Sequence, residues 1–222
     1  MTRLRDAAAS AGQAQTVHCV TDRRRFHLSS EDLVARAANA VRAGVDVIQV
    51  RERDLPDRQL TALVRQIVGV AVGSKTRVLV NDRADIAIVA GAAGVHLRGD
   101  SPSGSRVRAA FAADAASAAR ESKGFLIGRS VHSLADVDAA VAGGGCDYLM
   151  FGTVFPSEGK PEGHPVAGLE ALREVCARSP LPVIAIGGIT GERVAAVRDA
   201  GAAGFAAIGW FMFDTPSAGC LK

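Results

Sequence analysis

Short apolar runs rich in Val and Ile alternate with Ala-rich amphipathic segments along most of the chain. Because these runs are continuously apolar rather than alternating, they are typical of strands buried on both faces, as in a parallel sheet covered by helices. The predicted strands are Val17–Thr21, Val45–Val50, Arg77–Asn81, Gly94–Leu97, Phe125–Gly128, Asp147–Phe151, Val183–Ile186 and Gly204–Ile208. Segments with helical periodicity lie between them and include Ser30–Ala43, Pro56–Val72, Ser133–Ala142, Val166–Ala177 and Thr190–Ala200.

A degenerate cassette recurs along the chain, in which a helix-stopping glycine leads directly into a strand. It reads AGVDVIQV from residue 43, AGAAGVHL from 90, GGGCDYLM from 143 and AGAAGFAAI from 200. Intervals of roughly 50 residues suit two strand–helix units each, so the pattern predicts eight strands and a (β/α)8 TIM barrel. The rival architecture is a doubly wound open sheet, which needs a phosphate loop near its first strand, and no G-x-G-x-x-G follows Val17–Thr21.

The predicted barrel accounts for nearly the whole chain. We expect a flexible N-terminal segment over residues 1–15 and a single barrel domain over residues 16–222. Only Gly209–Lys222 follow the last predicted strand, so the final helix is expected to be short or missing.

Composition narrows the class of protein. The chain is 48% hydrophobic and 22% charged, as is usual for a soluble globular protein. Its net charge is only +3 and Arg23–Arg25 is its one basic run, so nucleic acid is not an expected partner. No stretch approaches the roughly 18 apolar residues of a membrane span, and the N-terminus lacks the apolar core of a secretory signal. We therefore expect a cytoplasmic protein without membrane contacts, whose four scattered cysteines stay reduced.

Barrel active sites are built at the carboxyl ends of the strands, where this chain carries many polar residues. In QVRER, Gln49, Arg51 and Arg53 share one strand face by the period of two, and they can fork around a diphosphate or a carboxylate. The alternative is that the arginines simply pair with neighbouring acids such as Glu52 or Asp54. Further polar residues at strand ends are Asp22, Asn81, Asp82, His96, Ser130, His132 and Thr153.

Two other patterns point to phosphate chemistry. The strand ends Gly187-Gly188 and Ile208-Gly209 occupy positions seven and eight, where barrels frequently bind phosphate through backbone N–H groups. The alternative interpretation is that these glycines only form tight turns between a strand and the following helix. Asn81 and Asp82 offer oxygen ligands for Mg²⁺, although Asp82 could instead cap the following helix.

A long polar loop follows the sixth predicted strand, from Phe151 to Gly168, and Ser157 and Lys160 within it could close over an anionic ligand. The alternative is a plain surface insertion. His96 and His132 could act as general acids or bases, although a lone histidine at a strand end is more often a hydrogen-bonded structural group.

Taken together, these residues resemble the superfamily of thiamine-phosphate synthases and thiazole tautomerases, from Val17 to Phe213. The resemblance rests on six motifs in order: HCVTD (18–22), IQVRER (48–53), LVNDRADIAIVAGAAGVHL (79–97), IGRSVHS (127–133), DYLMFGTVFPS (147–157) and PVIAIGGIT (182–190). For a synthase it implies that hydroxymethylpyrimidine diphosphate ionises with the help of Mg²⁺ and is captured by the nitrogen of a thiazole phosphate, releasing pyrophosphate.

The resemblance also implies a role for each matching residue. Gln49, Arg51 and Arg53 would hold the diphosphate, and Asn81 and Asp82 would lie on the Mg²⁺ side. Ser130 and Lys160 would stabilise the departing pyrophosphate, while Gly187, Gly188, Ile208 and Gly209 would bind the thiazole phosphate. His96, Thr153 and Ser157 complete the expected substrate-binding set.

The sequence departs from the synthase pattern at three places. Arg53 stands where synthases usually have Lys, and Ser157-Glu158-Gly159-Lys160 replaces their Thr-x-Thr-Lys loop. Arg98-Gly99-Asp100-Ser101 replaces their acidic stretch, so Asp100 is the candidate for a second metal carboxylate.

Two other functions therefore stay open. The first is the thiazole tautomerase, although that branch has a catalytic histidine where this chain has Thr153. The second is a non-catalytic protein that binds thiazole phosphate or thiamine phosphate. The expected partners are small phosphorylated molecules, with a possible homo-oligomer suggested by the apolar pair Trp210-Phe211.

Overall fold

A computed structural model describes residues 15–112, 124–157 and 163–211. Eight parallel strands form a closed barrel in the order β1 to β8, which confirms the predicted (β/α)8 fold. The chain forms two compact units: an N-terminal unit of Val17–His96 with the residues from Ala207 onward, and a central unit of Leu97–Ala206 with the residues up to Thr16. The expected flexible segment over residues 1–15 lies outside the described residues except for residue 15. The loop residue Lys160 also lies outside them.

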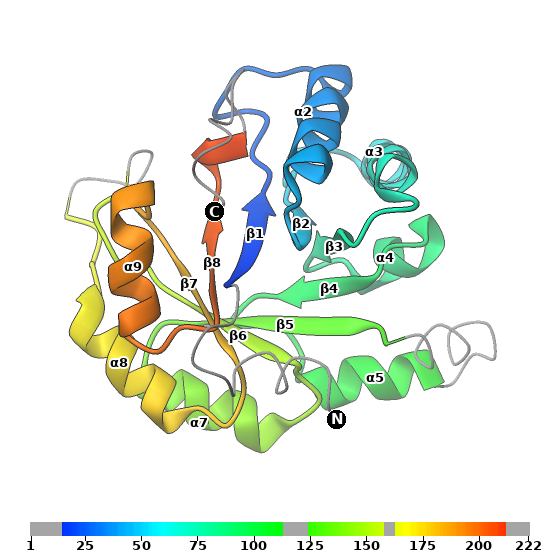
Figure 1. The fold of residues 1–222 in the computed structure, drawn as a ribbon. Coiled ribbons are helices and arrows are strands. Elements are labelled where there is room, and N and C mark those ends of the chain that lie inside the picture. The colour runs from blue at the N-terminus through cyan, green and yellow to red at the C-terminus, as the bar shows by residue number, and fades with distance from the viewer. Residues whose placement is uncertain (1–14, 113–123, 158–162, 212–222) are drawn as a thin grey trace. The chain divides into compact units, whose positions relative to one another are not determined.

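The N-terminal unit carries the first four strands, which pair in parallel so that their carboxyl ends share one edge. Its register brings Val20 opposite Gln49, and Asn81 opposite His96. Helices α2, α3 and α4 pack against one another beside these strands (Figure 1). The elements are β1 (Thr16–Val20), α2 (Ser30–Ala43), β2 (Val47–Val50), α3 (Asp57–Ala71), β3 (Arg77–Asn81), α4 (Ala84–Ala90), β4 (Gly94–Leu97) and, after the last strand, the 3-10 turn η1 (Gly209–Phe211).

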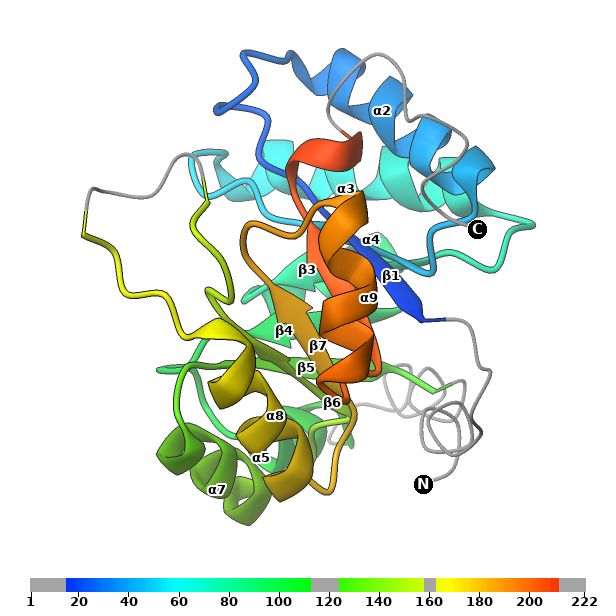
Figure 2. The ribbon, with the colours of Figure 1, turned by 60° about the vertical axis from the view of Figure 1, so that its left-hand side comes forward.

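The central unit continues the same alternation. Ser130 pairs with Met150 and Ile186 with Ala206 in the parallel ladder. Helix α8 packs against both α7 and α9, and the three can be followed in Figure 2. The elements are α5 (Gly104–Ala112), β5 (Leu126–Val131), α7 (Leu134–Gly143), β6 (Tyr148–Phe151), α8 (Gly168–Arg178), β7 (Val183–Ile186), α9 (Gly191–Asp199) and β8 (Gly204–Ala207).

The recurring cassette has a clear structural basis in its glycines and acids. Gly44 and Gly91 end their helices in the left-handed region, at φ 83° and 77°. In two copies an aspartate follows, and its carboxylate accepts a hydrogen bond from the N–H of the second residue of the preceding strand: Asp46 from Val17 at 2.9 Å, and Asp147 from Ile127 at 2.7 Å. The cassette therefore stops a helix and ties two strands together.

The strands are buried as predicted, since every residue of β2, β4, β6 and β8 is buried. Two expectations about residues at the strand ends are wrong. Strand β5 runs on to Val131, so Ser130 lies within the strand and not after it. Strand β2 ends at Val50, so the period of two does not extend to Arg51 and Arg53. After β8 the structure describes only the turn η1. Among the described helices, none is long and apolar enough to cross a membrane.

Candidate active site

Two amide side chains join the carboxyl ends of β2 and β3 in the N-terminal unit. Gln49 is only 2% exposed, and its Nε2 donates a hydrogen bond to Asn81 Oδ1 at 3.0 Å. The other amide atom, Gln49 Oε1, is buried and has no hydrogen-bond partner among the described residues. A buried acceptor left without a donor costs free energy, about 1–3 kcal/mol, so this oxygen marks a place where a donor is missing.

Arg51 follows directly at the end of β2 and is half-buried, with 25% of its side chain exposed. Its Nη1 lies 3.5 Å from Asp22 Oδ2 at the end of β1. Burial, and after it the charge of Arg53, lowers the pKa of the Arg51 guanidinium, which still stays charged at any physiological pH. Arg53 is exposed, and no acid among the described residues lies within ion-pair distance of it.

The alternative interpretation of these arginines, that they pair with the neighbouring acids, holds only in part. Glu52 and Asp54 both lie against Arg23 of the β1–α2 loop. Arg51 pairs instead with Asp22. The positive charge of Arg53 therefore remains available to a ligand.

Asp82 lies just beyond β3, in the left-handed region at φ 59°. Its N–H donates to the carbonyl of His96 at 2.8 Å, which holds the residue beside the end of β4. The N-cap of α4 is Arg83, so Asp82 is not the cap residue of that helix. An aspartate in this unusual conformation is a candidate functional group at a strand end.

The chemistry of the donors fits Mg²⁺ better than a metal held by protein ligands alone. No group of three or more His, Cys, Asp or Glu side chains in the described part of the chain could hold a metal ion. Mg²⁺ is usually bound by one or two carboxylates together with substrate phosphates and water. Asp82 can supply one such carboxylate at the end of β3.

His96 lies inside the strand layer and does not face solvent. It and His18 are each 2% exposed. Burial lowers the pKa of His18 to about 3, and burial together with the charge of the neighbouring His18 lowers that of His96 to about 3. Both histidines are therefore uncharged at neutral pH, so His96 can exchange hydrogen bonds with a ligand but offers no positive charge to a phosphate.

The glycine pair after β7 is held against the loop that follows β6, within the central unit. Gly187 and Gly188 have φ 103° and 62°, and a Cβ on Gly188 would overlap the carbonyl oxygen of Pro156. Their carbonyls accept hydrogen bonds from Phe155 N–H and from Arg193 Nη1. Their own N–H groups have no acceptor among the described residues. Two free N–H groups at successive left-handed residues form the kind of concave donor site that binds anions.

Two histidines flank the residues at the end of β6. Thr153 is buried, and its Oγ1 lies 3.1 Å from His164 Nε2. The Nδ1 atom of His132 lies 2.6 Å from the carbonyl oxygen of Gly152. Ser157, the last residue of this loop that the structure describes before residue 163, is half-buried.

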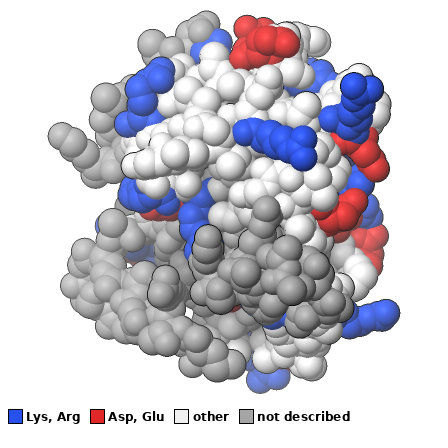
Figure 3. All heavy atoms as spheres, turned by 90° about the vertical axis from the view of Figure 1, so that its right-hand side faces the viewer, with Lys and Arg blue, Asp and Glu red and all other residues white. Residues whose placement is uncertain are grey.

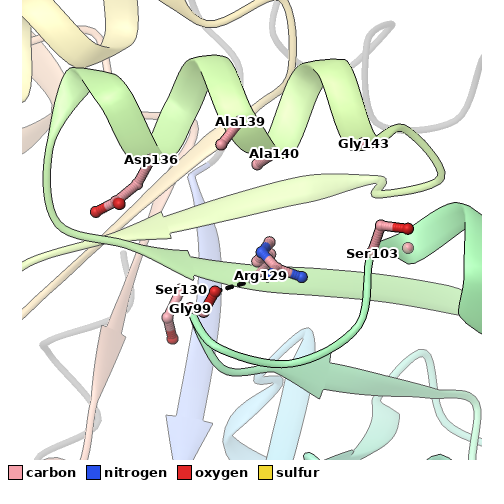
Figure 4. A pocket seen from close by; sticks show the side chains of 9 residues that line it. Gly99, Ser103, Arg129, Ser130, Asp136, Ala139, Ala140 and Gly143 are labelled. Atoms are coloured by element: carbon pink, nitrogen blue, oxygen red, sulfur yellow. Dashed lines mark hydrogen bonds between the residues drawn. The ribbon is translucent and has the colours of Figure 1, made fainter.

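Arg129 on β5 holds the loop between β4 and α5. Its guanidinium donates hydrogen bonds to the carbonyls of Gly99, Ser101 and Pro102, at 2.6, 2.8 and 3.0 Å. This loop, β5 and α7 enclose a cavity of about 100 Å³ (Figure 4), which is lined by Gly99, Ser103, Gly104, Arg129, Ser130, Asp136, Ala139, Ala140 and Gly143. Ser130 thus borders this cavity, and it is next in sequence to Arg129, whose guanidinium holds the β4–α5 loop.

The other expected site residues are more exposed. Asp100, the candidate for a second metal carboxylate, has 68% of its side chain exposed and forms an ion pair with Arg98. Ile208 and Gly209 follow β8 directly, and both are half-buried where η1 begins. On the face drawn in Figure 3, Lys and Arg side chains lie scattered among Asp and Glu, without one continuous basic patch on its described part.

Three residues of the site environment escaped the sequence interpretation: Thr21, Arg129 and His164. Thr21 and Arg129 lie inside the motifs HCVTD and IGRSVHS, but nothing in the sequence tells which atoms they contact. His164 lies in the second half of the loop that runs from Phe151 to Gly168, and it meets Thr153 because the two ends of this loop lie together. The backbone shows this, since Ala167 N–H donates to the carbonyl of Thr153 at 2.8 Å.

Comparison with known proteins decides the family. The family model described as thiamine monophosphate synthase matches residues 17–210. The chain belongs to the thiamine monophosphate synthase family. Among its relatives, the thiamine-phosphate synthase of Anaeromyxobacter dehalogenans is 41% identical over 172 residues, which are 78% of this chain and 72% of that protein. That of Methanoculleus marisnigri is 42% identical over 176 residues, covering 79% and 77%.

A solved structure agrees with this membership. The thiamine phosphate pyrophosphorylase from Pyrococcus furiosus superposes with a TM-score of 0.74 at 27% identity, covering 93% of both chains. Family membership therefore rests on sequence and on fold together.

Proposed function

We propose that this chain is a thiamine-phosphate synthase, which joins hydroxymethylpyrimidine diphosphate to thiazole phosphate and releases pyrophosphate. The observation that carries the proposal is the group of residues at the ends of β2 and β3. It comprises Arg51, the buried amide of Gln49 that is hydrogen-bonded to the half-buried Asn81, and the carboxylate of Asp82, which is next along the chain. Departure of a diphosphate needs positive charge and hydrogen-bond donors aimed at the leaving oxygens, and little covalent chemistry from the protein.

The arginines bind the diphosphate of the pyrimidine substrate. Arg51 offers a planar fork of donors, which suits phosphate oxygens, and Arg53 adds a second cation whose charge no described acid neutralises. Gln49 and Asn81 hold each other's side chains in place through their shared hydrogen bond. Gln49 Oε1 has no hydrogen-bond partner among the described residues, so it can accept a hydrogen bond from the substrate.

Asp82 would hold Mg²⁺ together with phosphate oxygens of the substrate. When bound, the ion neutralises charge on the diphosphate and so makes it a better leaving group. Asp100 would serve as a second carboxylate only after it releases Arg98. The hydroxyl of Ser130 would donate a hydrogen bond to the departing pyrophosphate. Lys160, which lies outside the described residues, would stabilise the same group with its positive charge.

The thiazole phosphate is assigned to the glycine strand ends. The N–H groups of Gly187 and Gly188 have no acceptor in the described parts of the chain, and this supports the assignment, because backbone donors bind phosphate without adding a titratable group. Ile208 and Gly209 are assigned to the same phosphate. His96, Thr153 and Ser157 remain candidates for contacts with the uncharged parts of the substrates.

A thiazole tautomerase is the second candidate function, and one contact favours it. The imidazole of His164 lies 3.1 Å from the hydroxyl of Thr153, the position at which the tautomerase branch has its histidine. A histidine near this position could move a proton at neutral pH, which the threonine hydroxyl alone does poorly.

The test incubates purified protein with the pyrimidine diphosphate, thiazole phosphate and Mg²⁺, and follows thiamine phosphate by its fluorescence after oxidation. A synthase forms product with the wild-type chain, loses it with Asp82→Ala, and retains it with the control Asp138→Ala, which removes an exposed carboxylate paired with Arg178. No thiamine phosphate, but isomerisation of the thiazole carboxylate phosphate, would support the tautomerase. Binding of the phosphorylated thiazole without either reaction would indicate a non-catalytic binder.

A further inference from the structure

A buried acid lies between the two arginines that the proposed function assigns to the diphosphate. Only 1% of the Glu52 side chain is exposed, and burial raises the pKa of its carboxyl, although hydrogen bonds from Thr21 and Arg23 act in the other direction. Placing a carboxylate in the protein interior costs free energy, and a buried ion pair is weak evidence that the charge is there for stability. Glu52 therefore needs a reason other than stability to occupy this position.

The carboxylate of Glu52 is held by donors from the end of β1 and the loop beyond it. Thr21 Oγ1 donates to Glu52 Oε1 at 2.5 Å, and the N–H of Arg23 lies 3.2 and 3.1 Å from the two carboxylate oxygens. The Arg23 guanidinium adds its charge, with Nε 3.8 Å from Oε2. These contacts draw Glu52 toward the β1–α2 loop.

The hydroxyl of Thr21 carries this constraint on to Arg51. A hydroxyl has one proton, and here it is given to Glu52. Its lone pairs are then free to accept the backbone N–H of Arg51, at 2.9 Å. An ionised Glu52 thus fixes the direction of the Thr21 hydroxyl, and the hydroxyl fixes the backbone of Arg51 immediately after β2 ends.

We propose that Glu52 is a positioning residue for diphosphate binding, which acts through Thr21 to hold Arg51 in the orientation that the substrate needs. The inference rests on the proposed function, since it assigns the diphosphate to Arg51. It predicts that the negative charge of Glu52, although it lies next to an anion-binding residue, favours anion binding. The gain from a correctly placed arginine outweighs the repulsion between the carboxylate and the diphosphate.

Positioning of Arg51 and charge repulsion by Glu52 change the affinity for an anion in opposite directions, so the direction of the change in a Glu52 variant distinguishes them. Glu52→Gln removes a negative charge, so an effect through space alone would tighten the binding of an anion. The glutamine can keep one acceptor for Thr21, but its amide group presents donors to the N–H of Arg23, so the network loses an acceptor. If positioning dominates, the same substitution weakens binding.

The experiment uses the full chain and measures the affinity for inorganic pyrophosphate with Mg²⁺ by calorimetry, together with kcat and both KM values of the synthase reaction. We expect Glu52→Gln to weaken pyrophosphate binding and raise KM for the pyrimidine diphosphate about tenfold or more, because small misplacements of a binding group have effects of this size. KM for thiazole phosphate should stay within about twofold.

Two variants of Thr21 separate positioning from general damage. Thr21→Val removes the hydroxyl at almost constant volume and should weaken pyrophosphate binding in the same direction, whereas Thr21→Ser keeps the hydroxyl and should retain most of the affinity. Glu31→Gln makes the same chemical change at an exposed residue in the first turn of α2, and should leave every value unchanged. If Glu52→Gln fails to fold, the two threonine variants still decide the question.

Native or tighter pyrophosphate binding in Glu52→Gln, or in Thr21→Val, would overturn the proposal. Its failure is distinguishable from failure of the proposed function. If the wild-type chain forms no thiamine phosphate, the function is wrong, while pyrophosphate binding still reports on Glu52.

Discussion

Lowering the pH from 7.5 to 5 should destabilise the folded chain, because His18 and His96 are buried without charge. Burial lowers both pKa values from 6.5 to about 3, so the folded state stays unprotonated at pH 5 while the unfolded chain takes up two protons. The contribution to stability is therefore fully present above the unfolded pKa of 6.5 and is lost as the pH falls from there toward 3.

The expected loss follows from the distance between pH 5 and the unfolded pKa. Each buried histidine should lower the free energy of unfolding by about 2 kcal/mol at pH 5, and the two together by about 4 kcal/mol. This figure depends little on the folded pKa as long as that lies below 4. The acids with lowered pKa values, such as Asp57 and Asp138, lose their contribution only at lower pH, so they do not account for a loss between pH 7.5 and 5.

Urea unfolding followed by far-UV circular dichroism at several pH values measures this loss. His18→Asn should reduce the loss between pH 7.5 and 5 by about half, whatever it does to stability at neutral pH. A wild-type stability that is flat between pH 7.5 and 5, or a full pH dependence in His18→Asn, would refute the reasoning.

Three substitutions in the central unit test other parts of the account. Gly188→Ala forces a left-handed alanine against the carbonyl of Pro156 and should cost about 2 kcal/mol or more of unfolding free energy, with a raised KM for thiazole phosphate; a native melting temperature would contradict this. Arg129→Ala removes three hydrogen bonds to carbonyls of the β4–α5 loop, so it should lower the free energy of unfolding by about 2 kcal/mol or more and speed proteolysis of this loop. Arg129→Lys should restore the stability only in part, because Lys lacks the planar fork of donors. Asp147→Ala leaves the Ile127 N–H without its acceptor and should lower unfolding free energy by about 1–3 kcal/mol; equal stability in urea would speak against the cassette's role.

The barrel itself was open to prediction because its signals are local and repeated. Continuous apolar runs mark strands buried on both faces, and the glycine cassette marks where each helix gives way to the next strand. The ends of the strands were harder to predict. Strand β2 ends at Val50 as predicted, but the sequence did not show that the following residues leave the strand face and that Glu52 contacts Thr21, about 30 positions away along the chain. The short helix α4 has too few turns for a periodic pattern to stand out.

The site was predicted as a set of residue types, and its contacts were not. The motif QVRER indicates arginines for an anion, yet only the structure shows that Arg51 pairs with Asp22 while Arg53 has no described acidic partner. The glycines after β7 were predicted for their freedom to approach a phosphate. Packing against the loop after β6 gives them a second physical reason, since a Cβ on Gly187 would lie 2.5 Å from Thr153 Cγ2. Such distances depend on the closed fold and cannot be read from spacing.

The most direct test of the central claim is a crystal structure of the protein with Mg²⁺, pyrophosphate and thiamine phosphate. The account predicts that pyrophosphate oxygens lie within hydrogen-bond distance of the Arg51 guanidinium, and that the phosphate of thiamine phosphate accepts hydrogen bonds from the N–H groups of Gly187 and Gly188. Pyrophosphate bound away from the end of β2, or a thiamine phosphate whose phosphate does not touch the glycine pair, would contradict it.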